Sequence, residues 1–312
     1  MPDRPAPSPN APPVPDAAHE RSLGLASGVS AYLIWGFFPL LFALVAAAGP
    51  LEILAHRVVW SLAAVSLALA LLRRPWGWLR TVFRGPRFVR LVAATVLVAV
   101  NWLTFIWAVN SGHVVEASLG YFINPLLNIA LGVVLFGERM RRTGAIGAAL
   151  ALAGVIVIGW QNWATLWVSL LLAGSFASYG AVKKRAPLPP LEGLFVESAL
   201  LAPLAIGYLV VLGATGAGLF GTQPAASGFL VLAGVLTALP LWLFAIAATR
   251  LEYGVLGILQ YLGPTIQFIL GLTVFGQHVG PTYWAGLVFV WCGSAVYLSG
   301  ALRRSRVELA PR

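Results

Sequence analysis

Residues 118–138 read SLGYFINPLLNIALGVVLFGE, an apolar stretch long enough for a helix to cross a bilayer, yet they carry Asn124–Pro125 near their middle. A second stretch of the same design, GILQYLGPTIQFILGLTVFGQ, occupies residues 257–277. The offset between the two is 139 positions, and it places Pro264 on the counterpart of Pro125. Matching interrupted helices in the two halves of a chain are typical of a transporter's binding site.

The similarity between the two halves continues outside these stretches. At the same offset Asn128 falls on Gln267, so an amide is kept within both apolar segments, and Gly147 falls on Gly286. Apolar runs recur along the chain and predict about ten transmembrane helices, at roughly 24–48, 52–72, 88–110, 114–137, 143–160, 164–183, 191–213, 228–249, 254–276 and 282–302. Each half then holds five helices. Because five is odd, the second half must enter the membrane in the opposite orientation, which predicts two inverted five-helix repeats.

The composition excludes an ordinary soluble protein. Of 312 residues, 59% are hydrophobic and 10% are charged, whereas roughly 25% are charged in a typical soluble domain. The composition therefore predicts an all-α integral membrane protein with many spans. The single cysteine, Cys292, cannot form an intrachain disulfide and says nothing about the redox compartment.

The formal charge of +10 indicates membrane orientation and not nucleic-acid binding. Nineteen of the twenty Lys and Arg residues lie in the tails or in alternate connections between apolar runs, and only Arg57 lies inside a run. Basic loops stay in the cytoplasm and attract anionic headgroups. Both termini are therefore predicted to be cytoplasmic. The predicted partners are the lipid bilayer with its anionic headgroups and a small-molecule substrate, with no nucleic acid.

The chain divides into four predicted parts. Residues 1–22 are rich in proline and are predicted to form a disordered cytoplasmic tail. Residues 23–160 form the first five-helix repeat, residues 161–302 form the second, and residues 303–312 form a basic cytoplasmic tail. The first tail lacks the basic segment, apolar core and cleavage site of a signal peptide.

Polar residues spaced three and four apart share one helix face in each interrupted stretch. They are Tyr121, Asn124 and Asn128 in the first stretch, and Gln260, Gly263 and Gln267 in the second. A side-chain amide in hydrocarbon needs a partner, because leaving it unpaired costs about 1–3 kcal/mol. These residues either line a substrate path or tie neighbouring helices together. Their repetition in both halves favours the path.

Aromatic residues beside isolated polar groups predict a pocket for a small organic molecule. The predicted substrate path consists of Tyr32, Trp35, Asn101, Trp102, Phe105, Tyr121, Asn124, Asn128, Trp242, Gln260, Tyr261 and Gln267. The predicted helix breaks are Pro125, Pro240, Gly263 and Pro264. Any single aromatic residue in this set can instead serve packing or the lipid interface.

Three charged residues within apolar runs are candidates for a gate or for coupling, namely Glu52, Arg57 and Glu197. A charge at a helix centre costs about 2.5–3.5 kcal/mol on insertion scales. These residues are either gate, substrate or proton-coupling groups, or structural and snorkelling charges. The four histidines show no paired spacing and no nucleophile–base pair is visible. The sequence therefore predicts no metal site, no cofactor and no catalysis.

Six segments resemble one family of membrane proteins. They are YLIWGFFPL at 32–40, AHRVVWS at 55–61, GYFINPLLN at 120–128, GERM at 137–140, GLFVES at 193–198 and LQYLGPTIQF at 259–268. Over residues 23–302 the chain resembles the RarD-type permeases of the EamA family, within the drug/metabolite transporter superfamily. The resemblance implies a bacterial inner-membrane transporter with a central cavity lined by helices one, three, four, six, eight and nine. The chloramphenicol-sensitivity label of these permeases does not by itself make chloramphenicol the substrate.

The sequence therefore predicts a secondary transporter, not an enzyme, that moves small organic metabolites or drug-like compounds by alternating access. No ATPase motif is present, so the energy would come from an ion or solute gradient. The alternative is a non-transporting scaffold or a subunit that needs a partner. Whether the protein forms a homodimer is left open.

Overall fold

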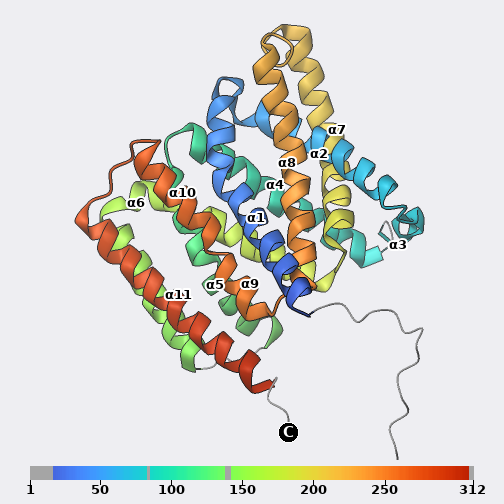
Figure 1. Ribbon diagram of the computed structural model, residues 1–312. Helices are drawn as coiled ribbons and strands as arrows, with labels where there is room; N and C mark the ends of the chain where they lie inside the picture. Colours follow the sequence, from blue (N-terminus) through green and yellow to red (C-terminus); the bar gives the residue numbers. More distant parts are fainter. Residues whose placement is uncertain (1–16, 83–84, 138–141, 309–312) are drawn as a thin grey trace, which may run out of the picture.

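The computed structural model describes residues 17–82, 85–137 and 142–308. All regular elements in these ranges are helices, which Figure 1 shows in chain order. They are α1 (Ala17–Leu44), η1 (Ala46–Ala48), α2 (Gly49–Leu71), η2 (Trp76–Trp78), α3 (Leu79–Val82), α4 (Gly85–Asn110), α5 (Val114–Phe136), α6 (Arg142–Arg185), α7 (Pro190–Thr215), α8 (Pro224–Ala248), α9 (Tyr253–Leu259), α10 (Leu262–Thr273) and α11 (Pro281–Glu308).

These helices confirm an all-α membrane protein. Nine stretches of the described chain are long and apolar enough to span a bilayer, and they coincide with the first nine predicted segments. The tenth predicted segment, 282–302, forms the 28-residue helix α11.

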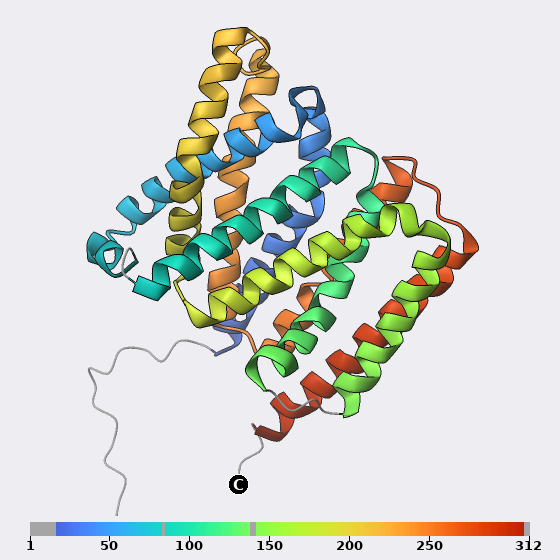
Figure 2. The same ribbon diagram turned by 180° about the vertical axis from the view of Figure 1, so that it is seen from behind.

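Helix α6 contains two of the predicted spans. Asn162 has non-helical backbone angles (φ −117°, ψ 32°), and the chain turns there into two arms, Arg142–Trp160 and Asn162–Arg185 (Figure 2). The Asn162 side chain donates a hydrogen bond to the Ile158 carbonyl oxygen at 3.1 Å. This bond satisfies one carbonyl that the corner would otherwise leave open.

The ends of the helical region differ from the predicted tails. Helix α1 begins at Ala17, inside the predicted 1–22 tail, where Glu20 forms an ion pair with Arg250 (Oε2–Nε 2.8 Å). Helix α11 continues to Glu308, inside the predicted 303–312 tail. Residues 1–16 and 309–312 lie outside the described residues. In Figure 1 the start of α1 and the end of α11 lie at the same end of the molecule.

The two proline-containing stretches have different backbones. Helix α5 continues through Pro125, whereas the second stretch breaks at Gln260–Tyr261 into α9 and α10. Pro264 explains the position of this break. A proline cannot bond to the carbonyl four residues earlier and clashes with it, and that residue is Gln260. The second stretch is therefore interrupted just before the predicted Gly263 and Pro264, whereas Pro125 and the predicted break Pro240 lie inside the continuous helices α5 and α8.

Helix α11 runs alongside the first arm of α6 (Figures 1 and 2). The two backbones approach closely through glycines. A β-carbon added at Gly147 would lie 2.7 Å from the Gly293 carbonyl oxygen, and one added at Gly286 would lie 2.6 Å from the Gly154 carbonyl oxygen. Small residues at a contact between membrane helices permit this packing.

Helix α1 lies between α8 and α10 and packs against the middle of the molecule (Figure 1). Its buried residues Phe38 and Phe42 join one apolar cluster with Phe105 of α4 and Leu172 of the second α6 arm. The same cluster also contains residues of α2, α5 and α8, so five other helices meet around α1. The polar groups described next lie beside this cluster.

Candidate functional site

Arg57 of α2 is buried within the span Ala46–Leu71, with 4% of its surface exposed. Its Nε donates a hydrogen bond to Thr237 Oγ1 of α8 at 2.8 Å. The guanidinium carbon lies 4.3 Å from the ring centroid of Trp102, and the rings of Phe38 and Phe42 lie within 6 Å. Three aromatic faces therefore stabilise this cation by cation–π contact.

A polar network joins α4, α5 and the second arm of α6. The Tyr121 hydroxyl donates to Asn101 Oδ1 at 3.2 Å. The Asn101 amide group donates to the Leu172 carbonyl oxygen at 3.0 Å and to Ser175 Oγ at 3.1 Å. Asn101, which the sequence predicts as a path residue, therefore ties three helices together. The ring of Tyr121 also packs against Phe105, with centroids 5.7 Å apart.

Three buried amide oxygens have no hydrogen-bond partner among the described residues: that of Asn110 at the end of α4, and two on the proline-containing helices. Gln267 of α10 donates through Nε2 to the Trp35 carbonyl oxygen of α1 at 3.1 Å, but its Oε1 is unpaired. Asn124 of α5 also has an unpaired Oδ1. Both residues are more than 90% buried. An unpaired buried acceptor is costly and needs an explanation, such as a ligand group that completes it.

An aromatic group flanks the Gln267 contact. The rings of Tyr32 and Trp35 on α1 lie 5.4 Å apart, and Phe244 of α8 lies 6.2 Å from each of them. Close to these rings, Gly263 of α10 faces the carbonyl oxygen of Tyr32. The predicted path residues Tyr32, Trp35 and Gln267 are therefore brought together.

Glu197 of α7 is buried, and one of its carboxylate oxygens has two hydrogen-bond donors. Its Oε1 accepts hydrogen bonds from Lys183 Nζ and from the Tyr179 hydroxyl, both at 2.9 Å. Lys183 and Glu197 form an ion pair with side chains 18% and 4% exposed. Both Lys183 and Tyr179 come from the second arm of α6.

Glu52 at the start of α2 accepts hydrogen bonds from two backbone amides of the loop between α7 and α8. These are the N–H groups of Leu219 (2.8 Å) and Phe220 (3.1 Å). His56 stacks on the Phe220 ring, with centroids 4.5 Å apart, and its Nε2 lies 3.9 Å from Glu52 Oε1. Glu52 thus holds a loop, and this contact lies apart from the aromatic rings around Arg57.

Some predicted path residues lie apart from this group. Asn128 is exposed, with Gly180 of α6 nearby, and Trp242 is 44% exposed. Tyr261 stacks on Phe122 with centroids 6.0 Å apart, on the side of the molecule that faces α11. Gln260 lies at the break between α9 and α10.

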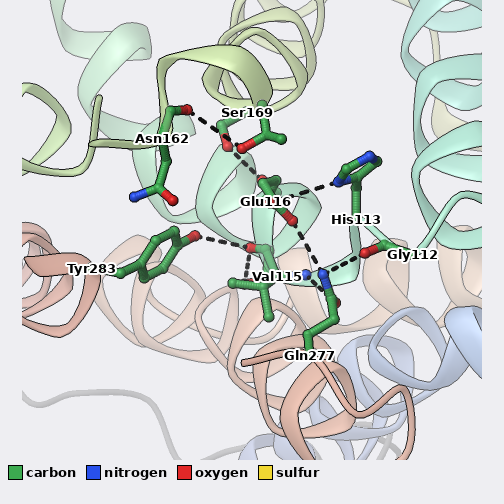
Figure 3. A network of polar contacts seen from close by, with 10 residues as sticks. Gly112, His113, Val115, Glu116, Asn162, Ser169, Gln277 and Tyr283 are labelled. Atoms are coloured by element: carbon green, nitrogen blue, oxygen red, sulfur yellow. Dashed lines mark hydrogen bonds and ion pairs between the residues drawn. The ribbon is translucent and has the colours of Figure 1, made fainter. Parts of the chain in front are cut away.

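A separate polar network joins the two halves at the turn between α4 and α5 (Figure 3). Gln277, in the loop after α10, accepts from the Val115 backbone N–H at 2.9 Å and donates to the Gly112 carbonyl oxygen at 2.6 Å. The same amide donates to Glu116 Oε2 at 3.3 Å. This amide caps the N-terminus of α5 as a backbone partner would, so the network is structural.

Sequence reasoning missed Lys183 and the ring of Phe42, whereas Phe38 is one of the aromatic residues that it assigned to the pocket from the first helix. Lys183 was counted as a loop charge, although Tyr179 and Lys183 stand four apart on a helix and so share a face. That spacing, set beside the buried Glu197, could have indicated the pair. Phe42 carries no sequence signal that separates it from an ordinary core residue. Among the described residues no group of three or more His, Cys, Asp or Glu could hold a metal ion.

Comparison with known proteins adds a family and a fold. The pattern of the EamA-like transporter family matches residues 22–160. Protein RarD of Streptomyces exfoliatus is 45% identical, covering 93% of this chain and 92% of its own. An uncharacterized transporter of Pseudomonas aeruginosa is 43% identical, covering 91% of this chain and 95% of its own. A chain of known crystal structure is similar in fold, with a TM-score of 0.59 at 20% identity, covering 90% of this chain and 99% of that one.

Proposed function

The chain belongs to the EamA-like transporter family, and on that premise we propose that it is a secondary transporter of small organic metabolites or drug-like compounds in the bacterial inner membrane. The family, with its RarD-named members, consists of transporters and not enzymes. Transport proceeds by alternating access, in which two inverted five-helix halves rock about the central helices. Both termini are cytoplasmic in this proposal.

Reciprocal glycine contacts support the inverted repeat. At the 139-residue offset Gly147 corresponds to Gly286, and Gly154 corresponds to Gly293. In space the pairs cross, because Gly147 packs against Gly293 and Gly154 packs against Gly286. Crosswise contact between equivalent positions is what a two-fold axis produces.

An asymmetry between related helix pairs supports alternating access. Ser61 of α2 donates to the Gly234 carbonyl oxygen of α8 at 3.0 Å, and Gly234 has no room for a β-carbon. At the same offset Gly234 corresponds to Thr95 of α4, which donates to Leu91 of its own helix at 2.8 Å. Helices α2 and α8 are thus joined by a hydrogen bond, whereas the equivalent residue on α4 bonds only within its own helix. Such a difference between the two halves is expected when one side of a transporter is closed.

The observation that carries the proposal is the pair of unpaired amide oxygens on the proline-containing helices. Asn124 Oδ1 lies one residue before Pro125, and Gln267 Oε1 lies one turn after Pro264. Membrane helices keep unpaired polar groups only at a cost, so such groups indicate a function. A substrate with hydrogen-bond donors would complete both oxygens, beside the aromatic rings of Tyr32 and Trp35.

We expect the double variant Asn124→Ala with Gln267→Ala to transport its solute about 5- to 150-fold more slowly than the wild type. Two lost hydrogen bonds are worth about 0.5–1.5 kcal/mol each, and about 1.4 kcal/mol corresponds to a factor of ten. The measurement is uptake of a panel of metabolites and drugs, chloramphenicol included, by liposomes containing the purified protein. Thr273→Ala, exposed on the same helix α10, is the control. If the wild type moves no solute faster than empty liposomes, the proposal is wrong.

We also propose that Glu197 couples transport to protons, since it is a buried carboxylate on the second half. The variant Glu197→Gln keeps the acceptor for the Tyr179 hydroxyl and removes the charge. The expected result is that transport no longer depends on an imposed pH gradient, measured in the same liposomes. An unchanged dependence in this variant contradicts the assignment and leaves the transport function standing.

A further inference from the structure

Arg57 is a buried cation without an anion. Among the described residues no carboxylate pairs with it, and its one hydrogen bond uses Nε. Its two terminal amino groups make no hydrogen bond to any described residue. A guanidinium has five N–H donors in a flat fork that fits a carboxylate. Four of these donors are therefore unused on a side chain that is 96% buried.

The other buried charges of the described chain are neutralised or solvated by the protein. Glu197 has Lys183, and Glu52 has two backbone N–H groups. Near the starts of α2 and α7 the offset between the halves is 140 positions, since Pro50–Leu51–Glu52 matches Pro190–Leu191–Glu192, and at this offset Arg57 is the counterpart of Glu197. One half thus carries an internal ion pair where the other half carries a lone cation. A difference of this kind between equivalent positions points to a ligand and not to a structural pair.

The surroundings of Arg57 orient its unused edge. Thr237 fixes Nε from the α8 side, while the rings of Trp102, Phe38 and Phe42 surround the guanidinium carbon. The Phe42 ring contacts Phe105, which in turn packs against Tyr121 of the polar network described above. The cation therefore lies next to the predicted path and not at the lipid surface.

We propose that the terminal amino groups of Arg57 bind the carboxylate of the transported solute, so that the substrate class is an organic acid with an apolar or aromatic body. This inference rests on the transport function proposed above. A bidentate Arg–carboxylate contact is among the strongest hydrogen-bonded contacts in proteins. The aromatic rings beside the guanidinium would pack against the body of the acid. Rocking of the two halves would give the solute access to this buried group.

Matched acid and ester pairs test the proposal. The probes are phenylacetate and 3-phenylpropionate, and each acid is compared with its own methyl ester. Chloride, added as sodium chloride without an organic acid, is the inorganic control anion. Binding to the purified full chain is read as thermal stabilisation in detergent, and uptake is read in liposomes. For the wild type we expect the acids to bind at least about tenfold more tightly than their esters. In Arg57→Gln the acids should lose that advantage while the esters bind unchanged.

Two further variants keep the test decisive. Arg90→Gln removes one charge from an exposed position on α4 and should keep the preference for acids. Thr237→Val leaves the Arg57 charge in place but removes its hydrogen bond, and it should weaken acid binding less than Arg57→Gln does. It also stands in for Arg57→Gln if that variant is not recovered folded.

The outcomes separate this inference from the function on which it rests. Equal binding of acid and ester by the wild type overturns it, and so does stabilisation by chloride to which the acids add nothing. A wild type that transports neutral solutes without preferring acids leaves the transport function intact and removes the carboxylate site. Acid binding that depends on Arg57, without transport of any solute, supports the site and contradicts the function.

Discussion

Replacing Lys183 by methionine is expected to lower the free energy of unfolding by about 3–5 kcal/mol, the cost of breaking a buried ion pair from one side. The partner left behind, Glu197, is 3% exposed, and Lys183 Nζ is one of its two hydrogen-bond donors. Methionine keeps the apolar length of lysine, so the loss reports the missing charge and not a cavity. The measurement is the midpoint of thermal unfolding in detergent.

The double variant Lys183→Met with Glu197→Gln separates charge from packing. It removes both charges and keeps an acceptor for the Tyr179 hydroxyl, so it should recover most of the stability that the single variant loses. Arg74→Met, exposed in the turn after α2, removes one positive charge without a buried partner and should change the midpoint little. A single variant Lys183→Met as stable as the wild type would show that Glu197 finds another partner and that the pair is not structural.

The helices could be predicted from the sequence because hydrocarbon imposes a simple rule on each of them. A span needs about 20 apolar residues and satisfies its backbone internally, so spans can be found one at a time. The charge rule then limits their orientation. The connection near residue 162 was predicted for the same reason, because the apolar runs at 143–160 and 164–183 meet at a short polar interruption, and the structure has the kink of α6 there.

The partners of the site residues could not be predicted in this way, because a partner depends on how helices pack. The sequence marked both Arg57 and Glu197 as buried charges, but nothing in it says that Lys183 reaches Glu197 while Arg57 finds only Thr237 and aromatic rings. Asn101 was predicted to line the path, and it ties α4 to α5 and α6. The prolines show the same limit, since Pro264 breaks its helix and Pro125 does not.

Adding a methyl group at Gly154 is expected to destabilise the protein by about 1–3 kcal/mol or more, the range for overpacking. Its β-carbon would overlap the carbonyl oxygen of Gly286, and backbone cannot move aside as a flexible side chain can. Helices α6 and α11 would have to separate along their length. The readout is again the midpoint of thermal unfolding in detergent.

The matched control, Gly174→Ala, lies on the second arm of the same helix α6, where an added β-carbon meets nothing within 4 Å. It should stabilise by about 0.5–1 kcal/mol, because alanine loses less conformational entropy than glycine in a helix. The two substitutions are chemically identical and are expected to differ in sign. A stable Gly154→Ala variant would contradict the close approach of α6 and α11.

The two-fold relation adds a stricter expectation. Gly286→Ala inserts its methyl group against the Gly154 carbonyl oxygen, the reverse of the contact that Gly154→Ala disturbs. If the halves are related by a two-fold axis, each variant should cost a similar amount. The double variant should cost less than the sum of the two, because separating the helices once accommodates both methyl groups. Costs that differ widely, or that simply add, would mean that the two glycines lie in unrelated contacts and would weaken the inverted repeat on which alternating access depends.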